Sequence, residues 1–180
     1  MKKIIIAGVL GLSMAATMTS YAASEGGSYG GFQYALGTYS EDGFDDANPN
    51  ALVGRYGKFV NDNFAIEGRI GFGIGDDSIS TTFGDISIEA DTLIGVYGLG
   101  HVEINDSSSV YGLLGFTRGE LTASASGITF SDDDSGLSYG VGANVGVSDS
   151  LALNLEYIQY LSTSDYDFTA IGLGVVFSFE

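Results

Sequence analysis

The C-terminal stretch TAIGLGVVFSFE, residues 169–180, decides the fold of this chain. Its large apolar residues recur at every second position: Ile171, Leu173, Val175, Phe177 and Phe179. The alternate positions include four small residues: Ala170, Gly172, Gly174 and Ser178. One large apolar face and one face nearly bare of side chains are typical of a barrel wall between lipid and a narrow, packed lumen. The pattern therefore predicts the closing strand of a transmembrane β-barrel.

The start of the chain has the features of a secretory signal peptide. Two lysines precede an apolar run from Ile4 to about Ala16, and Ser20 and Ala22 occupy the small-residue positions of a cleavage site. We expect residues 1–22 to be removed and residues 23–180 to form a single domain. A membrane-anchoring helix is the alternative, but the run is short and no stop-transfer charges follow it.

Composition favours an all-β fold and narrows the choice of partners. The chain has 28 Gly, 11 Tyr and 11 Phe, a single Pro, and no Cys or Trp. Beyond the leader, four Lys and Arg stand against 23 Asp and Glu, which excludes nucleic acid as a partner. No stretch there approaches the roughly 20 apolar residues of a spanning helix, so membrane insertion has to be by strands.

Alternation along the chain predicts an eight-stranded antiparallel transmembrane β-barrel, with strands near the roughly 9–11 residues that a tilted spanning strand needs. The expected strands are Gly31–Tyr39, Leu52–Phe59, Phe64–Ile74, Ile88–Val102, Val110–Arg118, Leu137–Val147, Leu151–Leu161 and Thr169–Phe179. Short connections alternate with long, polar and acidic ones. This alternation predicts short periplasmic turns and long acidic extracellular loops.

The polar face of the strands indicates which side meets lipid. In the expected strand Leu137–Val147 that face consists of Ser138, Gly140, Gly142, Asn144 and Gly146. Water-exposed sheet faces carry Lys, Glu, Thr and Arg, whereas Gly and Ser fit a cramped interior. We therefore expect the large apolar residues to face lipid. A soluble ligand-binding barrel, which would bury them, is the alternative.

Four charged residues fall on the small-residue face: Arg55, Glu67, Arg69 and Glu156. Because an unpaired charge in hydrocarbon is costly, we predict that they form a charge network in the lumen. Such a network can be a plug, a gate or a proton path. Eight strands leave an interior just wide enough for side chains, which favours the plug. A narrow porin-like channel for small solutes is the alternative.

Aromatic residues near the strand ends are predicted to form two interfacial girdles. They are Tyr29, Phe32, Tyr39, Phe59, Phe64, Tyr111, Tyr157, Tyr160, Phe177 and Phe179. The expected strands Ile88–Val102 and Val110–Arg118 carry apolar residues on both faces, so their register stays open.

The sequence offers little for catalysis or for metal binding. The single histidine, His101, has Glu103 two residues on and no Ser–His arrangement, and the chain has no cysteine. The acidic runs at 41–46 and 131–136 lack the ligand spacing of an EF-hand. We therefore expect no catalytic, cofactor-binding or metal-binding residues. The acidic loops could still share divalent cations with lipopolysaccharide phosphates.

Several segments resemble one family of bacterial proteins. VYGLLGFTRGEL (110–121), GLSYGVGANVGVSDSLALNLEY (136–157) and IGLGVVFSF (171–179) resemble the second half of the OmpX/Ail/PagC group of small outer-membrane proteins. FVNDNFAIEGRIGF (59–72) is similar to a hairpin of the wider OmpA-like class.

The resemblance implies a monomeric barrel in a Gram-negative outer membrane. It implies insertion by the outer-membrane assembly machinery, with Phe177 and Phe179 as the signal in the last strand. Glu180 follows that signal. Group members use their loops for adhesion, complement evasion or surface stabilisation. Expected partners are outer-membrane lipid, lipopolysaccharide and an unidentified surface or host ligand.

Overall fold

The computed structural model describes residues 26–41, 48–74, 77–81, 84–125, 128–162 and 166–179. Within these ranges the chain forms strands joined by turns. They are β1 (Ser28–Glu41), β2 (Asn50–Asn61), β3 (Phe64–Gly73), β4 (Asp77–Thr81), β5 (Gly84–Asn105), β6 (Ser108–Ala125), β7 (Ile128–Ser148), β8 (Leu151–Ser162) and β9 (Tyr166–Phe179). The predicted signal peptide and Glu180 lie outside the described residues. No helix among those residues is long and apolar enough to cross a bilayer.

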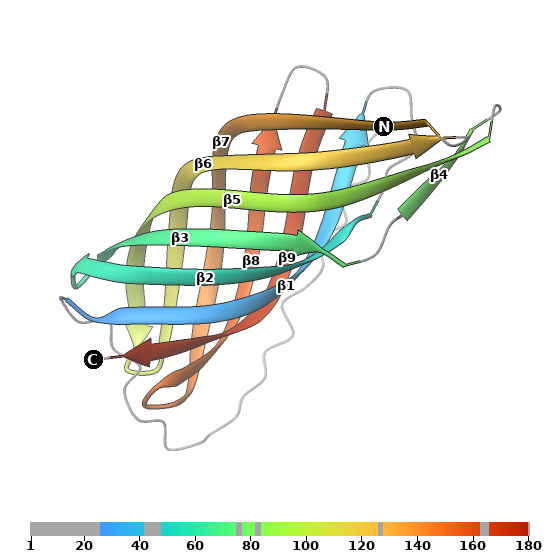
Figure 1. The fold of residues 1–180 in the computed structure, drawn as a ribbon. Coiled ribbons are helices and arrows are strands. Elements are labelled where there is room, and N and C mark those ends of the chain that lie inside the picture. Colours follow the sequence, from blue (N-terminus) through green and yellow to red (C-terminus); the bar gives the residue numbers. More distant parts are fainter. Residues whose placement is uncertain are drawn as a thin grey trace, which may run out of the picture.

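Eight of the strands close into an antiparallel barrel, as predicted (Figure 1). Each pairs with its neighbours in the chain, β1 pairs with β9, and β3 pairs with β5 to complete the ring. Closure leaves no free sheet edge within the membrane, which is the condition for a β-structure to span lipid. The additional strand, β4, pairs with β5 alone and lies outside the ring.

Strands β5, β6 and β7 are longer than predicted. The expected loop between β6 and β7, residues 119–136, instead continues the antiparallel ladder from Gly119 opposite Asp134 to Ala125 opposite Ile128. These residues are mostly small or polar, so they lack the apolar alternation used to detect strands. The prediction of a long loop was therefore wrong here. The run Asp132–Asp134 belongs to β7.

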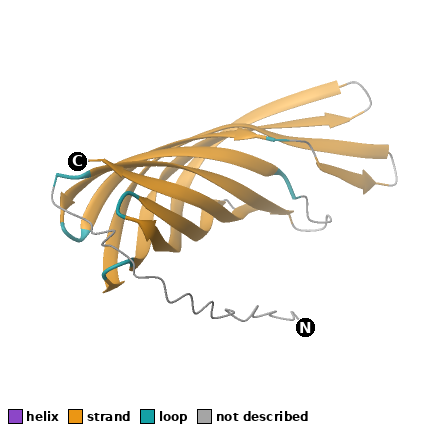
Figure 2. Ribbon diagram, turned by 90° about the horizontal axis from the view of Figure 1, so that it is seen from below, coloured by secondary structure: helices purple, strands orange, loops and turns teal. Residues whose placement is uncertain are grey.

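Three tight turns lie at one end of the barrel, beside the start of β1 and the end of β9 (Figure 1). They are Asp62–Asn63, Asp106–Ser107 and Asp149–Ser150. In the first, Asn61 Oδ1 accepts hydrogen bonds from the backbone N–H groups of Asn63 and Phe64, at 3.0 and 2.9 Å. We call this end the turn rim. The opposite end, where β5, β6 and β7 extend past the other strands, is the projecting rim (Figure 2).

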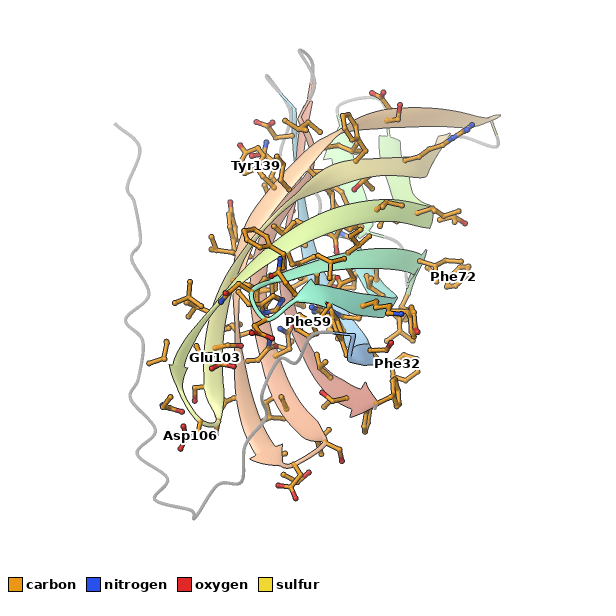
Figure 3. The ribbon with its side chains drawn as sticks, turned by 90° about the vertical axis from the view of Figure 1, so that its left-hand side faces the viewer. Phe32, Phe59, Phe72, Glu103, Asp106 and Tyr139 are labelled. Carbon is orange, nitrogen blue, oxygen red and sulfur yellow. The ribbon has the colours of Figure 1, made fainter. Side chains whose placement is uncertain are left out.

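The apolar face of the strands lies outside, as expected. Residues of β3 alternate between exposed and buried along almost its whole length. Phe32 and Phe72 point away from the barrel in Figure 3 and are more than half exposed, at 59% and 52%. On β9, Leu173 is exposed while Val176 on the other face is buried. A wide apolar outer surface of this kind contradicts the soluble-barrel alternative.

The aromatic prediction was only partly right. Phe32, Phe64, Tyr157, Phe177 and Phe179 are exposed on the outer face, as a girdle requires, but Tyr29, Phe59, Tyr111 and Tyr160 are buried in the lumen. A narrow barrel has to fill its interior, and large rings do so efficiently. The side chain of Tyr39 lies outside the described residues.

The structure also settles the faces of β5 and β6, which the sequence left open. Leu93, Tyr97, Leu99 and His101 of β5 are buried, as are Tyr111, Leu113 and Thr117 of β6. The residues between them, such as Val96 and Leu114, are exposed. Each of the two strands is apolar on both faces, because one face packs in the lumen and the other face meets lipid.

Candidate functional site

The predicted lumen residues Arg55, Glu67, Arg69 and Glu156 lie together in the barrel interior, with side chains at most 1% exposed. Arg69 Nε is 2.6 Å from Glu67 Oε1. Its Nη1 and Nη2 donate to the two carboxylate oxygens of Glu156 at 2.5 and 2.8 Å, a bidentate pair. Arg55 Nη2 is 3.1 Å from Glu67 Oε2, and Arg55 Nη1 is 3.9 Å from Glu156 Oε2.

The strand register explains this arrangement. Arg55 of β2 stands directly opposite Arg69 of β3, so two positive charges are neighbours on the inner wall. Like charges in such a pair repel unless opposite charges separate them. Glu67 comes from β3 itself, and Glu156 reaches across from β8 on the far wall. Two acids and two bases therefore balance, which burial in a small barrel requires.

Polar side chains surround the ion pairs. Tyr111 Oη donates to Glu156 Oε2 at 2.6 Å, and Arg55 Nη1 donates to Asn154 Oδ1 at 3.0 Å. The amide of Asn154 in turn donates to Asn144 Oδ1 at 2.8 Å. The network thus joins β2, β3, β6, β7 and β8 across the lumen. Its members satisfy one another, which offsets much of the desolvation cost of buried charge.

A second chain of contacts begins at Tyr97. The Arg69 guanidinium carbon lies 4.6 Å from the centre of the Tyr97 ring, a cation–π distance. Tyr97 Oη is 2.6 Å from Thr117 Oγ1, and Thr117 contacts Ser138. Ser138 Oγ donates to the Tyr160 carbonyl at 2.7 Å. The charged cluster is therefore tied to the wall on several sides.

Glycines on the inner wall make room for these side chains. A Cβ added at Gly142 would overlap the Tyr111 ring, and one at Gly57 would overlap the Tyr29 ring. The same holds for Gly115 beneath Tyr97. The small residues that alternate along the strands therefore form the inner surface against which large side chains from neighbouring strands pack.

Apolar and aromatic layers cover the charged cluster at both ends. Toward the projecting rim, Val53, Leu93, Tyr160 and Phe168 line an enclosed cavity of about 20 Å³. Toward the turn rim, the His101 ring lies 5.1 Å from the rings of both Phe59 and Tyr111. A cavity of about 10 Å³ remains beside it. Each cavity has about the volume that a single water molecule needs.

Sequence reasoning missed several members of this interior. Tyr97 and Gln33 were not singled out, and Tyr111 was assigned to the interface. A partial signal was the cross-strand pairing of large residues with glycine, as in Tyr111 opposite Gly142, although the exposed Tyr56 also lies opposite a glycine, Gly68. Detecting it requires a register that the sequence did not fix. The predicted assembly residues Phe177 and Phe179 lie on the outer face of β9, 38% and 51% exposed.

No arrangement suited to catalysis or to metal binding was found among the described residues. None of their His, Asp and Glu side chains forms a group of three that could hold a metal ion. His101 is buried between the rings of Phe59 and Tyr111.

A closed barrel with an apolar outer belt and a packed polar interior defines a transmembrane β-barrel protein. Residues 7–179 match the family model described as the outer membrane protein beta-barrel domain. The chain belongs to this family, in agreement with the resemblance found in the sequence. Comparison with curated proteins gave no match.

Solved structures of outer-membrane barrels share the fold. Ail, the attachment invasion locus protein of Yersinia pestis, is 23% identical with a TM-score of 0.65, over 86% of this chain and 99% of that one. Neisserial surface protein A is 15% identical with a TM-score of 0.65, over 86% and 100% of the two chains. OprG from Pseudomonas aeruginosa is 12% identical with a TM-score of 0.57, over 89% and 99%.

Proposed function

We propose that this protein is a non-enzymatic surface-interaction protein of a Gram-negative outer membrane, with a plugged lumen and an acidic binding region outside the cell. One observation carries the proposal. Strand β7 pairs with β6 along its whole projecting part, but its pairing with β8 begins only at Tyr139 opposite Gln159. Among the described residues, the Ile128–Ser138 part of β7 therefore has a strand partner on the β6 side alone, and its other side is a sheet edge. Such an edge is a template for an added strand from a partner.

The negative charge of this edge favours a positively charged partner. It contains Asp132–Asp134, and the whole chain is strongly acidic. The acids discourage pairing between two copies of the same edge, and they favour an extended segment rich in Lys or Arg. Ail has been solved with the heparin analogue sucrose octasulfate, a polyanion. For the present chain we expect cationic ligands instead.

The remaining parts of the proposal follow from the sequence and the fold. Residues 1–22 serve as the cleaved leader, and Phe177 and Phe179 present the outward-facing terminal aromatics to the assembly machinery. The turn rim faces the periplasm and the projecting rim faces outward. The protein acts as a monomer in contact with lipid and lipopolysaccharide. Divalent cations shared with its carboxylates reduce the repulsion between two acidic surfaces.

Shortening the projecting hairpin tests the surface role. Arg118 and Ser135 are paired across β6 and β7, so residues 119–134 can be replaced by a two-residue Asn-Gly turn, which removes the acidic run. Cells carrying this variant should lose binding to an immobilised lysine-rich peptide while the barrel still folds. A charge variant, Asp132→Asn with Asp133→Asn and Asp134→Asn, keeps the edge and should lose the preference for the cationic peptide over heparin. Unchanged binding by both variants would refute the proposed surface.

The narrow-channel alternative is tested by conductance. Because the ion pairs and the two apolar layers fill the lumen, we expect no stable single-channel current in planar bilayers. Reproducible current steps from the unmodified protein would favour a pore instead.

A further inference from the structure

The outer wall of the barrel carries a hollow of about 300 Å³ toward the projecting rim. It lies over β1, β8 and β9 and the start of β2. The lining includes Leu36, Thr38, Asn50, Tyr157, Thr169 and Ile171. This volume lies at the lower end of the range for small-molecule sites.

The hollow lies where the outer surface changes from apolar to polar. On β1 the outward residues end their apolar run at Leu36 and continue with Thr38. On β9 the run ends at Ile171 and continues with Thr169. These positions are at the same height, because Leu36 pairs with Ile171 and Thr38 pairs with Thr169. The hollow therefore spans the boundary between hydrocarbon and head groups.

Its chemistry changes across the same boundary. Two hydroxyl groups and the Asn50 amide line the polar half, and the half-exposed ring of Tyr157 stands beside two aliphatic side chains in the apolar half. No charged residue lines the hollow. Uncharged donors and acceptors beside an aromatic ring suit the hydroxyl groups and flat face of a sugar ring, while the aliphatic side chains suit an acyl chain.

We propose that this hollow binds the sugar of an outer-leaflet glycolipid, with an acyl chain lying along Leu36 and Ile171. The assignment rests on the proposed outer-membrane orientation, in which the projecting rim faces outward. It names a lipid partner at a site distinct from the acidic β7 edge.

The placement of charge favours the sugar over the phosphate of such a lipid. The outward cations of the mature chain are Lys58, which pairs with Ser28 at the start of β1, and Arg118 on β6. Neither lines the hollow. The carboxylate of Asp167, two residues beyond Thr169, accepts a hydrogen bond from Gln159 Nε2 at 2.8 Å. A nearby carboxylate repels phosphate but leaves neutral hydroxyl groups unaffected.

A tryptophan reporter makes the binding measurable. The chain has no Trp, so Tyr157→Trp places a unique fluorophore in the hollow, and Trp suits the membrane interface. The full-length protein, folded in detergent micelles, is titrated with lipid A, with dephosphorylated lipid A and with phosphatidylethanolamine. We expect both forms of lipid A to shift the Trp emission with similar affinity in the presence of EDTA, and phosphatidylethanolamine to bind at least tenfold more weakly.

Substitutions in the polar half of the hollow test whether its side chains contact lipid A. Asn50→Leu combined with Thr169→Leu should weaken lipid A binding about tenfold or more, since two hydrogen-bonding groups are lost. Thr169→Ser retains the hydroxyl and should bind normally. Ser148→Leu is the control, because Ser148 is an exposed polar residue at the turn-rim end of β7, outside both the hollow and the acidic edge.

Three results would overturn the inference: equal affinity for phosphatidylethanolamine, loss of binding on dephosphorylation, or normal binding by the double variant with a folded barrel. Loss of peptide binding at the β7 edge leaves these measurements unchanged, so the two proposals fail separately.

Discussion

At the residue scale, the interior depends on pairs of positions brought together by register. Arg55 faces Arg69 across β2 and β3, and this repulsive pair is tolerated because Glu67 and Glu156 both reach it. Removing either acid or either base leaves a buried charge without its partner. Each of the four side chains therefore depends on the other three.

Replacing Arg69 with alanine tests that dependence. Arg69→Ala leaves Glu156 without its bidentate partner, and we expect the free energy of unfolding to fall by roughly 3–5 kcal/mol. The measurement is the urea midpoint of the protein folded into lipid vesicles. Lys58→Ala is the control, since Lys58 is exposed on the outer face and its loss should change little. An unchanged midpoint for Arg69→Ala would place Arg69 outside any stabilising network.

The interior glycines give a second test with a control on the neighbouring strand. Gly142→Ala puts a methyl group into the Tyr111 ring, and overpacking of this kind costs roughly 1–3 kcal/mol. At Gly112 the added methyl group meets nothing within 4 Å, so Gly112→Ala should be nearly neutral. The urea midpoints of the two variants compare the effect of a methyl group beneath the Tyr111 ring with its effect at an open position. Equal effects would mean that Tyr111 does not lie over Gly142.

The two-residue alternation along the strands was enough to assign the four charged residues to the inner face, because a charge near the middle of a spanning strand is costly in lipid. Tyr111 and Tyr160 were assigned wrongly for a physical reason. Tyrosine is favourable both at a membrane interface and in a packed lumen, so the residue type alone does not show which face of the strand it occupies.

At the element scale, β9 was predictable because it meets lipid on one face and the lumen on the other, so its alternation is complete. The projecting parts of β5, β6 and β7 leave the membrane and lose that constraint. Their residues still pair along the backbone, from Ile86 opposite Ala125 inward. A strand outside lipid does not need an apolar face, so its sequence resembles that of a loop.

The depth of β9 in the membrane can be tested on its outer face. Leu173→Arg should destabilise the barrel by roughly 2–4 kcal/mol if Leu173 lies near the bilayer midplane. Thr169→Arg is on the same face but beyond the apolar boundary, where the cost falls to roughly 0–1 kcal/mol. The change in the free energy of unfolding of each variant is to be measured by reversible unfolding in lipid vesicles. A larger loss at Thr169 than at Leu173 would contradict the position of the boundary.

The same strand carries the proposed assembly signal. Phe179→Ala should reduce the amount of folded, heat-modifiable protein in the outer membrane, because the last outward aromatic of β9 is lost. Deleting Glu180 should leave assembly intact or improve it, since the chain then ends on Phe179. Heat-modifiability on gels of outer-membrane fractions measures both. Normal assembly of Phe179→Ala would mean that the machinery recognises another feature of the strand.

At the scale of the whole molecule, the charges inside the barrel are paired, whereas those outside are mostly acidic. Two of the four basic residues that follow residue 22, Arg55 and Arg69, are neutralised in the lumen. Among the described side chains, the exposed acids outnumber the exposed bases Lys58 and Arg118; these acids are Asp62, Glu103, Asp106, Asp149 and Asp167. The run Asp132–Asp134 is in the projecting part of β7. The interior thus contributes little to the net charge, and the outer surface dominates how the protein meets other molecules.

The orientation of the barrel determines which of these surfaces a partner can reach. We expect a cysteine at Ser126, between β6 and β7, to react with a membrane-impermeant thiol reagent on intact cells, because the proposed orientation has the projecting rim facing outward. A cysteine at Asp106, in an exposed turn at the other rim, should react only after the outer membrane is permeabilised. The native chain has no cysteine, so any labelling reports the introduced residue alone. Labelling of Asp106→Cys but not of Ser126→Cys on intact cells would reverse the barrel. The acidic edge would then face the periplasm, where no external partner could bind it, and the proposed surface role could not stand.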